Sequence, residues 1–114
     1  MDIVIKRIYQ DAAKRDGSRV LVDRIWPRGV SKADANLDQW MKEIAPSTDL
    51  RKWFDHKEER FKEFSTKYKK ELQDKPELIK ELKSMAEEKR LSLLYGAKDE
   101  EHNQAVVLRE FLLS

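Results

Sequence analysis

The chain has 114 residues, no cysteine, 39% hydrophobic and 40% charged residues, and a formal net charge of +2 at pH 7. A globular chain of this length buries one core and forms one domain, and its composition is not that of a disordered tail. The lack of cysteine excludes disulfides, thiolate catalysis and cysteine-ligated zinc. No segment approaches the roughly 18 apolar residues of a membrane span, so we expect a cytoplasmic protein without membrane contact.

The first half of the chain shows strand signals. The stretch DIVIKRI alternates and is rich in β-branched residues, which predicts a strand that ends near Tyr9. RVLVD, residues 19–23, is a short apolar run typical of a buried strand. Residues 38–45 fit a helix or a strand, and the loop signal Ala45-Pro46 that follows them favours a strand.

The second half is mainly helical. A short helix is predicted around LRKWF, a longer one over residues 58–73 and another from Pro76, each with apolar side chains at helical spacing. Residues 91–95 form an apolar run suited to a central strand, and a last helix begins near His102. Together the elements predict a single α/β domain over residues 1–114, with about four mostly parallel strands flanked by helices.

Two polar clusters follow predicted strands. DRIWPRG comes after the second strand and GAKDEEHN after the last one. Ligands of open α/β sheets bind beyond the carboxyl ends of the strands, so we expect both clusters to face one pocket. The candidate ligand-binding residues are Arg7, Arg24, Trp26, Arg28, Tyr95, Lys98 and Asn103.

These residue types indicate binding of an anion. Arginine offers a rigid fork to carboxylate or phosphate, and Trp26 offers a flat face to a base. The free N–H groups at the start of the last helix also favour an anion. Asp23, Asp99 and His102 are the candidate general acids or bases.

Each candidate also has a structural interpretation, which stays open. Asp23 can form an internal ion pair with Arg24 or Arg7, Trp26 can belong to the core, and His102 can cap a helix or face solvent. The chain has two histidines, no EF-hand loop, no H-E-x-x-H and no glycine-rich phosphate loop. We therefore expect no metal and no cofactor.

Several long motifs identify a resemblance. In chain order they are IKRIY, DG-RVLVDRIWPRGVSK, LDQWMKEIAPS, LRKWFDH, F-EF--KY--EL and LLYGAKDEEHNQAVVL. They cover nearly the whole chain and closely resemble the YeaO-like branch of the superfamily catalogued as domain of unknown function 488. The resemblance implies a small Rossmann-like α/β domain, and it implies no particular reaction.

The wider superfamily adds one comparison. Many of its members have a strand that ends L-L-C and a Cys-His-Arg triplet that opens the last helix, a pattern of thiol or metal chemistry. The matching positions here are Leu94-Tyr95 and Asn103-Gln104-Ala105. The resemblance thus implies that this branch has lost catalysis or replaced it.

Three functions from different classes follow. The first is binding of an anionic small molecule, a nucleotide or an exposed nucleic-acid base in the pocket at the strand ends. The second is an enzyme, a hydrolase or transferase, that acts on a nucleotide or glycosidic substrate by carboxylate or histidine acid–base catalysis. The third is a protein-interaction domain whose polar clusters are structural. We rank binding first, because the sequence supplies many anion-holding groups and no poised nucleophile.

Overall fold

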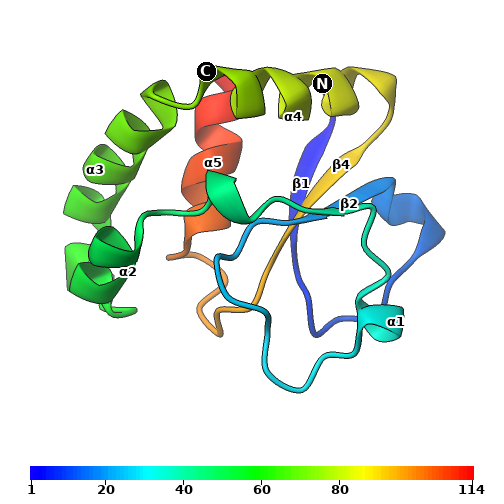
Figure 1. Cartoon of the computed structure of the whole chain (residues 1–114), viewed down its shortest axis with the longest axis horizontal. Coiled ribbons are helices and arrows are strands. Elements are labelled where there is room, and N and C mark those ends of the chain that lie inside the picture. Colours follow the sequence, from blue (N-terminus) through cyan, green and yellow to red (C-terminus); the bar gives the residue numbers. More distant parts are fainter.

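A single four-stranded parallel sheet forms the centre of the protein, in a computed structural model that describes residues 1–114. Its strands are β1 (Ile3–Arg7), β2 (Ser18–Leu21), β3 (Gln39–Trp40) and β4 (Leu91–Tyr95), arranged in the order β1-β4-β2-β3. All three strand pairs are parallel, so the carboxyl ends of the strands point to one edge, toward the bottom of Figure 1. The predicted α/β domain with about four parallel strands is confirmed.

Four helices lie on one side of the sheet (Figure 1). They are α2 (Thr48–Phe54), α3 (Phe61–Gln73), α4 (Pro76–Glu88) and α5 (Gln104–Leu113). Helices α4 and α5 contact the strands of the sheet, α3 packs on α5, and α2 packs on α3. Their buried side chains share one apolar cluster with Val20, Leu91 and Leu93 of the central strands. None of the helices has the length and apolar character that crossing a membrane requires.

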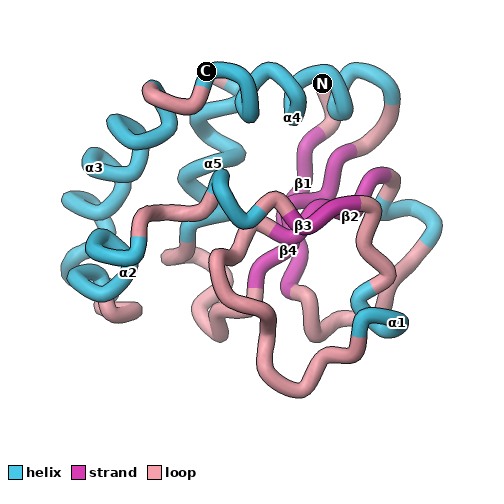
Figure 2. The backbone as a smooth tube through the Cα atoms, viewed as in Figure 1, coloured by secondary structure: helices cyan, strands magenta, loops and turns pink.

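The other face of the sheet is covered mainly by the chain between β2 and β3. Figure 2 shows that this segment is mostly loop, with one short helix, α1 (Lys32–Ala35). Asn36 ends α1 in the left-handed conformation, with φ 46°. A second apolar cluster forms here around Leu21 and Leu94, against which Trp26 and Trp40 pack. The helices therefore flank the sheet unevenly.

Two predicted element boundaries need correction. The expected strand over residues 38–45 is a strand only at Gln39–Trp40, and Lys42–Ile44 form a 3-10 turn. Because of that turn, the Ile44 side chain lies in the main core. The helix expected from residue 58 begins at Phe61, after a 3-10 turn at Glu58–Arg60.

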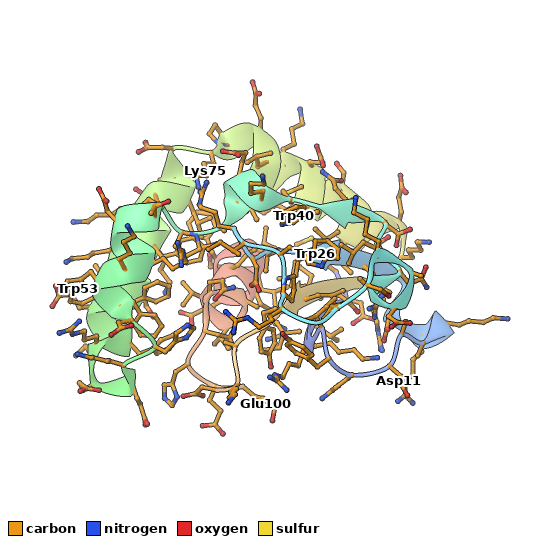
Figure 3. All side chains as sticks on the ribbon, turned by 60° about the horizontal axis from the view of Figure 1, so that its bottom comes forward. Asp11, Trp26, Trp40, Trp53, Lys75 and Glu100 are labelled. Carbon is orange, nitrogen blue, oxygen red and sulfur yellow. The ribbon has the colours of Figure 1, made fainter.

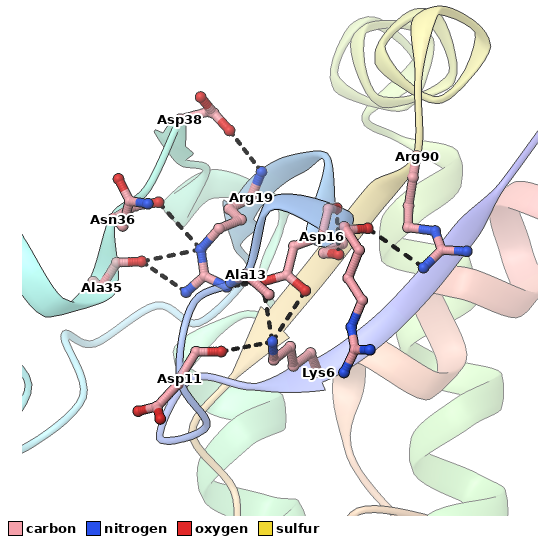
Figure 4. Close-up of polar contacts among 11 residues, drawn as sticks. Lys6, Asp11, Ala13, Asp16, Arg19, Ala35, Asn36, Asp38 and Arg90 are labelled. Atoms are coloured by element: carbon pink, nitrogen blue, oxygen red, sulfur yellow. Dashed lines mark hydrogen bonds and ion pairs between the residues drawn. The ribbon is translucent and has the colours of Figure 1, made fainter.

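A buried polar network holds the amino end of the sheet (Figure 4). Asp16, just before β2, accepts hydrogen bonds from Arg19 Nη1 at 2.6 Å and from Lys6 Nζ at 3.0 Å. Arg19 also donates to the carbonyls of Ala35 and Asn36. Burial alone would raise the pKa of Asp16, but these bonds and the Ala13 N–H hold that pKa below its ordinary value. The network thus joins β1, β2 and the end of α1.

We expect Arg19→Met to destabilise the protein by about 3–5 kcal/mol, because it leaves the buried Asp16 carboxylate and the Ala35 carbonyl short of a donor. Lys69→Met is the matched control, since Lys69 pairs with Glu110 at the surface and such pairs contribute about 1 kcal/mol or less. Denaturant unfolding followed by circular dichroism measures both variants. Equal losses of stability in the two variants would show that the Asp16 network is not structural.

Candidate functional site

A cavity of about 580 Å³ opens at the carboxyl edge of the sheet. We call it the carboxyl-edge cavity. Its walls come from the loops after β1, β2 and β4, from the Ala45-Pro46 segment, and from α2, α3 and the start of α5. The side chains that matter most for its chemistry are Asp23, Arg24, Arg51, Lys98, Asp99 and Gln104. Its position matches the expected place for a ligand in a parallel sheet.

Asp23 is the central acidic group of this cavity. Its Oδ2 accepts the backbone N–H of Gly96 at 2.9 Å, and its Oδ1 accepts a hydrogen bond from Gln104 Nε2. Burial raises the pKa of the Asp23 carboxyl to about 6, although these two hydrogen bonds act to lower it. The expected ion pair with Arg24 or Arg7 does not form, because both arginines donate to backbone carbonyls instead.

Arg24 forms part of the cavity wall and is largely committed to structure. Its Nε donates to the carbonyl of Pro46 at 3.0 Å and its Nη2 to the carbonyl of Ala45 at 3.1 Å. Lys75 Nζ donates to the same Ala45 carbonyl at 3.1 Å, from the far side of that segment. Arg24 therefore ties the end of β2 to the segment that leads into α2.

Arg51, in α2, is a cavity cation without a partner. Its Nε is buried and has no hydrogen-bond partner, and its guanidinium takes part in no ion pair. Native proteins satisfy nearly all buried polar atoms, so an unsatisfied one calls for an explanation such as a bound molecule. Phe54, three residues on, and Phe64 give this side of the cavity an apolar wall.

The loop between β4 and α5 supplies three of the predicted residues. Lys98 and Asp99 line the cavity, and so does Asn103, whose Oδ1 accepts the N–H of Val106 and caps α5. Asp99 contacts His102 Nδ1 at 2.9 Å, while His102 does not line the cavity. The N–H of Glu101 and the contacts with His102 hold the pKa of Asp99 below its ordinary value.

His102 is also the centre of the single cluster with metal-ligand chemistry. Ligand atoms of Glu58, Asp99 and His102 all lie within 4.8 Å of one another. Asp99 faces Nδ1 of the imidazole, however, and Glu58 faces Nε2 at 3.6 Å. Each residue offers one ligand atom, so a cation there would have at most three protein ligands. Closed protein sites for zinc use four ligands.

Four of the predicted ligand-binding residues lie outside the cavity lining. Trp26 packs edge-on against Trp40, with ring centroids 5.3 Å apart, and donates its indole N–H to the Val30 carbonyl (Figure 3). Its ring thus packs against the smaller core and does not line the cavity. Arg7 stacks on Tyr9, whose hydroxyl donates to the Arg28 carbonyl. Tyr95 is buried in the main core, where burial raises its pKa.

Sequence reasoning missed four groups of the cavity. Arg51 precedes Phe54 by three residues, a spacing that places both side chains on one side of a helix and was a usable signal. Gln104 holds Asp23, and no local pattern indicated this role. Gly96 lies close to Asp23: a Cβ at this position would be 3.0 Å from Asp23 Oδ2, so a larger residue would require the carboxyl to shift. His56, which follows the end of α2, is exposed and also lines the cavity.

The family model and the similar proteins point to the same family. Residues 2–114 match the family model described as "Inactive DUF488-N3 subclade". The uncharacterized protein YeaO of Escherichia coli (strain K12) is 45% identical over 114 residues, which are 100% of this chain and 99% of that protein. The uncharacterized protein Rv3073c of Mycobacterium tuberculosis (strain ATCC 25618 / H37Rv) is 39% identical over 108 residues, 95% of this chain and 91% of that protein. No solved structure gives a significant match. The chain therefore belongs to the YeaO-like DUF488 family, within the subclade described as inactive.

Proposed function

We propose that the protein is a binding domain whose carboxyl-edge cavity holds a small organic anion. The observation that carries this proposal is Arg51, a cation that lines the cavity with a buried Nε and no partner. A carboxylate or phosphate that accepts hydrogen bonds from the terminal nitrogens of the Arg51 guanidinium would neutralise the charge. The cavity volume of about 580 Å³ lies within the range of small-molecule sites.

The other groups of the cavity fit the same ligand. Lys98 at the mouth forms no ion pair and adds positive charge to the entrance. Phe54 and Phe64 offer apolar contact, and Ile25, 58% exposed, lies at the rim. A nucleotide, a sugar phosphate or an aromatic carboxylate has the required anion. The description of the matching subclade as inactive favours binding over catalysis.

Arg51→Met tests the proposal. A hydrogen bond to a charged group is worth about 1.5–3 kcal/mol, so the affinity for the anion should fall about 10- to 100-fold. The unliganded variant should be at least as stable as the wild type, because methionine removes a buried, unsatisfied nitrogen. Calorimetric titration against nucleotides, sugar phosphates, aromatic carboxylates and short single-stranded DNA and RNA, at low and moderate salt, measures the affinities.

Arg28→Met is the matched control for that titration. Arg28 is exposed and lies outside the cavity lining, so its loss should change the affinity little. Two results would contradict the proposal: wild-type affinity in Arg51→Met, or equal losses in both variants. The second result would point to a diffuse surface charge effect, of the kind that salt screens.

One observation favours the enzyme as a second candidate. The pKa of Asp23 is raised to about 6, and a carboxyl that titrates near neutral pH suits general acid–base catalysis. In this alternative Asp23 moves the proton of a nucleotide or glycosidic substrate. Turnover of such a substrate that is lost in Asp23→Asn, with binding retained, would support it. A broad panel of nucleotides and glycosides without turnover would count against it.

Titration of the Asp23 carboxyl carbon by NMR should show a midpoint near pH 6. Gln104→Leu removes a hydrogen bond to the charged form, so it should move the midpoint higher. Since the folded pKa exceeds the ordinary 3.8, ionising Asp23 costs stability, and its contribution to the free energy of unfolding falls between about pH 4 and pH 6. Asp23→Asn should remove that part of the pH dependence. A midpoint near 4 would contradict the burial of this carboxyl.

A further inference from the structure

The carboxyl-edge cavity contains two opposite charges that do not meet. Asp23 has only the neutral donors Gly96 N–H and Gln104 Nε2, and no cation pairs with it. Arg51 has no acceptor at its buried Nε and no carboxylate partner. An unpaired charge is costly when it is buried, and the Asp23 carboxyl is largely buried whereas Arg51 is partly exposed. Both groups thus have unused capacity for a partner of opposite charge.

The two groups belong to different walls of the cavity. Asp23 follows β2 and is held by the loop after β4 and by the first residue of α5. Arg51 is on α2, which packs against α3. Arg24 lies next to Asp23 in the chain but is occupied by the carbonyls of Ala45 and Pro46. Neither charge is therefore neutralised by a neighbouring side chain.

We propose that the ligand of this cavity is a small zwitterion, whose anionic group binds Arg51 and whose ammonium or other cationic N–H group binds Asp23. The inference rests on the anion-binding function proposed above and adds a second charge to the ligand. Each Asp23 oxygen already accepts one hydrogen bond and has a further lone pair for the ligand. Phe54 and Phe64 line the same cavity and suit an apolar group between the charges or beside them. An α-amino acid with an apolar side chain has all three features.

The titratable groups around the cavity agree with this charge arrangement. Burial raises the pKa of Asp23 to about 6, so its carboxylate form prevails at pH 7.5. The other charged or titratable groups of the lining are Arg24, Arg51, His56, Lys98 and Asp99. Asp99 is half-exposed and already contacts His102, which leaves Asp23 as the shielded acceptor for a cation.

Three matched probes test the inference by calorimetry at pH 7.5. L-Phenylalanine has both charges, 3-phenylpropanoate lacks the ammonium, and phenethylamine lacks the carboxylate. We expect L-phenylalanine to bind about tenfold or more tightly than either of the others, because each charged hydrogen bond adds affinity. In Asp23→Asn, L-phenylalanine and 3-phenylpropanoate should bind alike. In Arg51→Met, L-phenylalanine and phenethylamine should bind alike.

The outcomes separate this inference from the proposed function. If 3-phenylpropanoate binds as tightly as L-phenylalanine and Asp23→Asn changes nothing, the zwitterion is overturned while the anion site stands. If no probe binds at millimolar concentration, the zwitterion inference is also overturned. The proposed anion-binding function is then tested only by the wider panel of anions. Amide spectra of both variants should match the wild type away from the cavity, and Asp23→Glu, which restores the charge, should recover part of the preference for L-phenylalanine.

Discussion

The Asp23 carboxyl is the interaction on which the arrangement around the cavity depends. It accepts one hydrogen bond from Gly96 after β4 and one from Gln104 at the start of α5, while its own residue follows β2. Its backbone carbonyl accepts the indole N–H of Trp40 at 2.7 Å, which adds the end of β3. One residue thus fixes three strand ends and a helix start. The acid in the stretch VLVDRIWPRG is first a structural group, and its position at the cavity follows from that role.

Much of the fold could be predicted because its signals are local. The apolar runs of β2 and β4 and the helical stripes of α3 and α4 depend on residues close in the chain. The parallel topology then placed Asp23, Lys98 and Asn103 at one edge before any contact was known. The position of Trp26 could not be predicted in this way. The Val30 carbonyl that accepts its indole N–H is brought close by the turn of a loop, and residue spacing does not determine that turn.

The polar side chains at the start of α5 have structural roles. At the positions where the resemblance implies a cysteine and a histidine, this chain has Asn103 and Gln104. Asn103 caps the helix, and Gln104 bonds Asp23. Both side chains are thus engaged in structure, and neither is a nucleophile. This agrees with a subclade described as inactive, and it concentrates the remaining chemistry on Asp23 and Arg51.

A ligand that bridges Asp23 and Arg51 would also change the stability of the domain. The sheet edge and α2 are joined near the cavity by Arg24, which contacts the carbonyls of Ala45 and Pro46. A bound zwitterion would add a second connection between the same parts and would neutralise two charges that cost stability while they are unpaired. Binding to the folded state alone raises its stability in proportion to ln(1 + [L]/Kd). Under the proposed function, ligand binding would therefore depend on how the segment leading into α2 is joined to the end of β2.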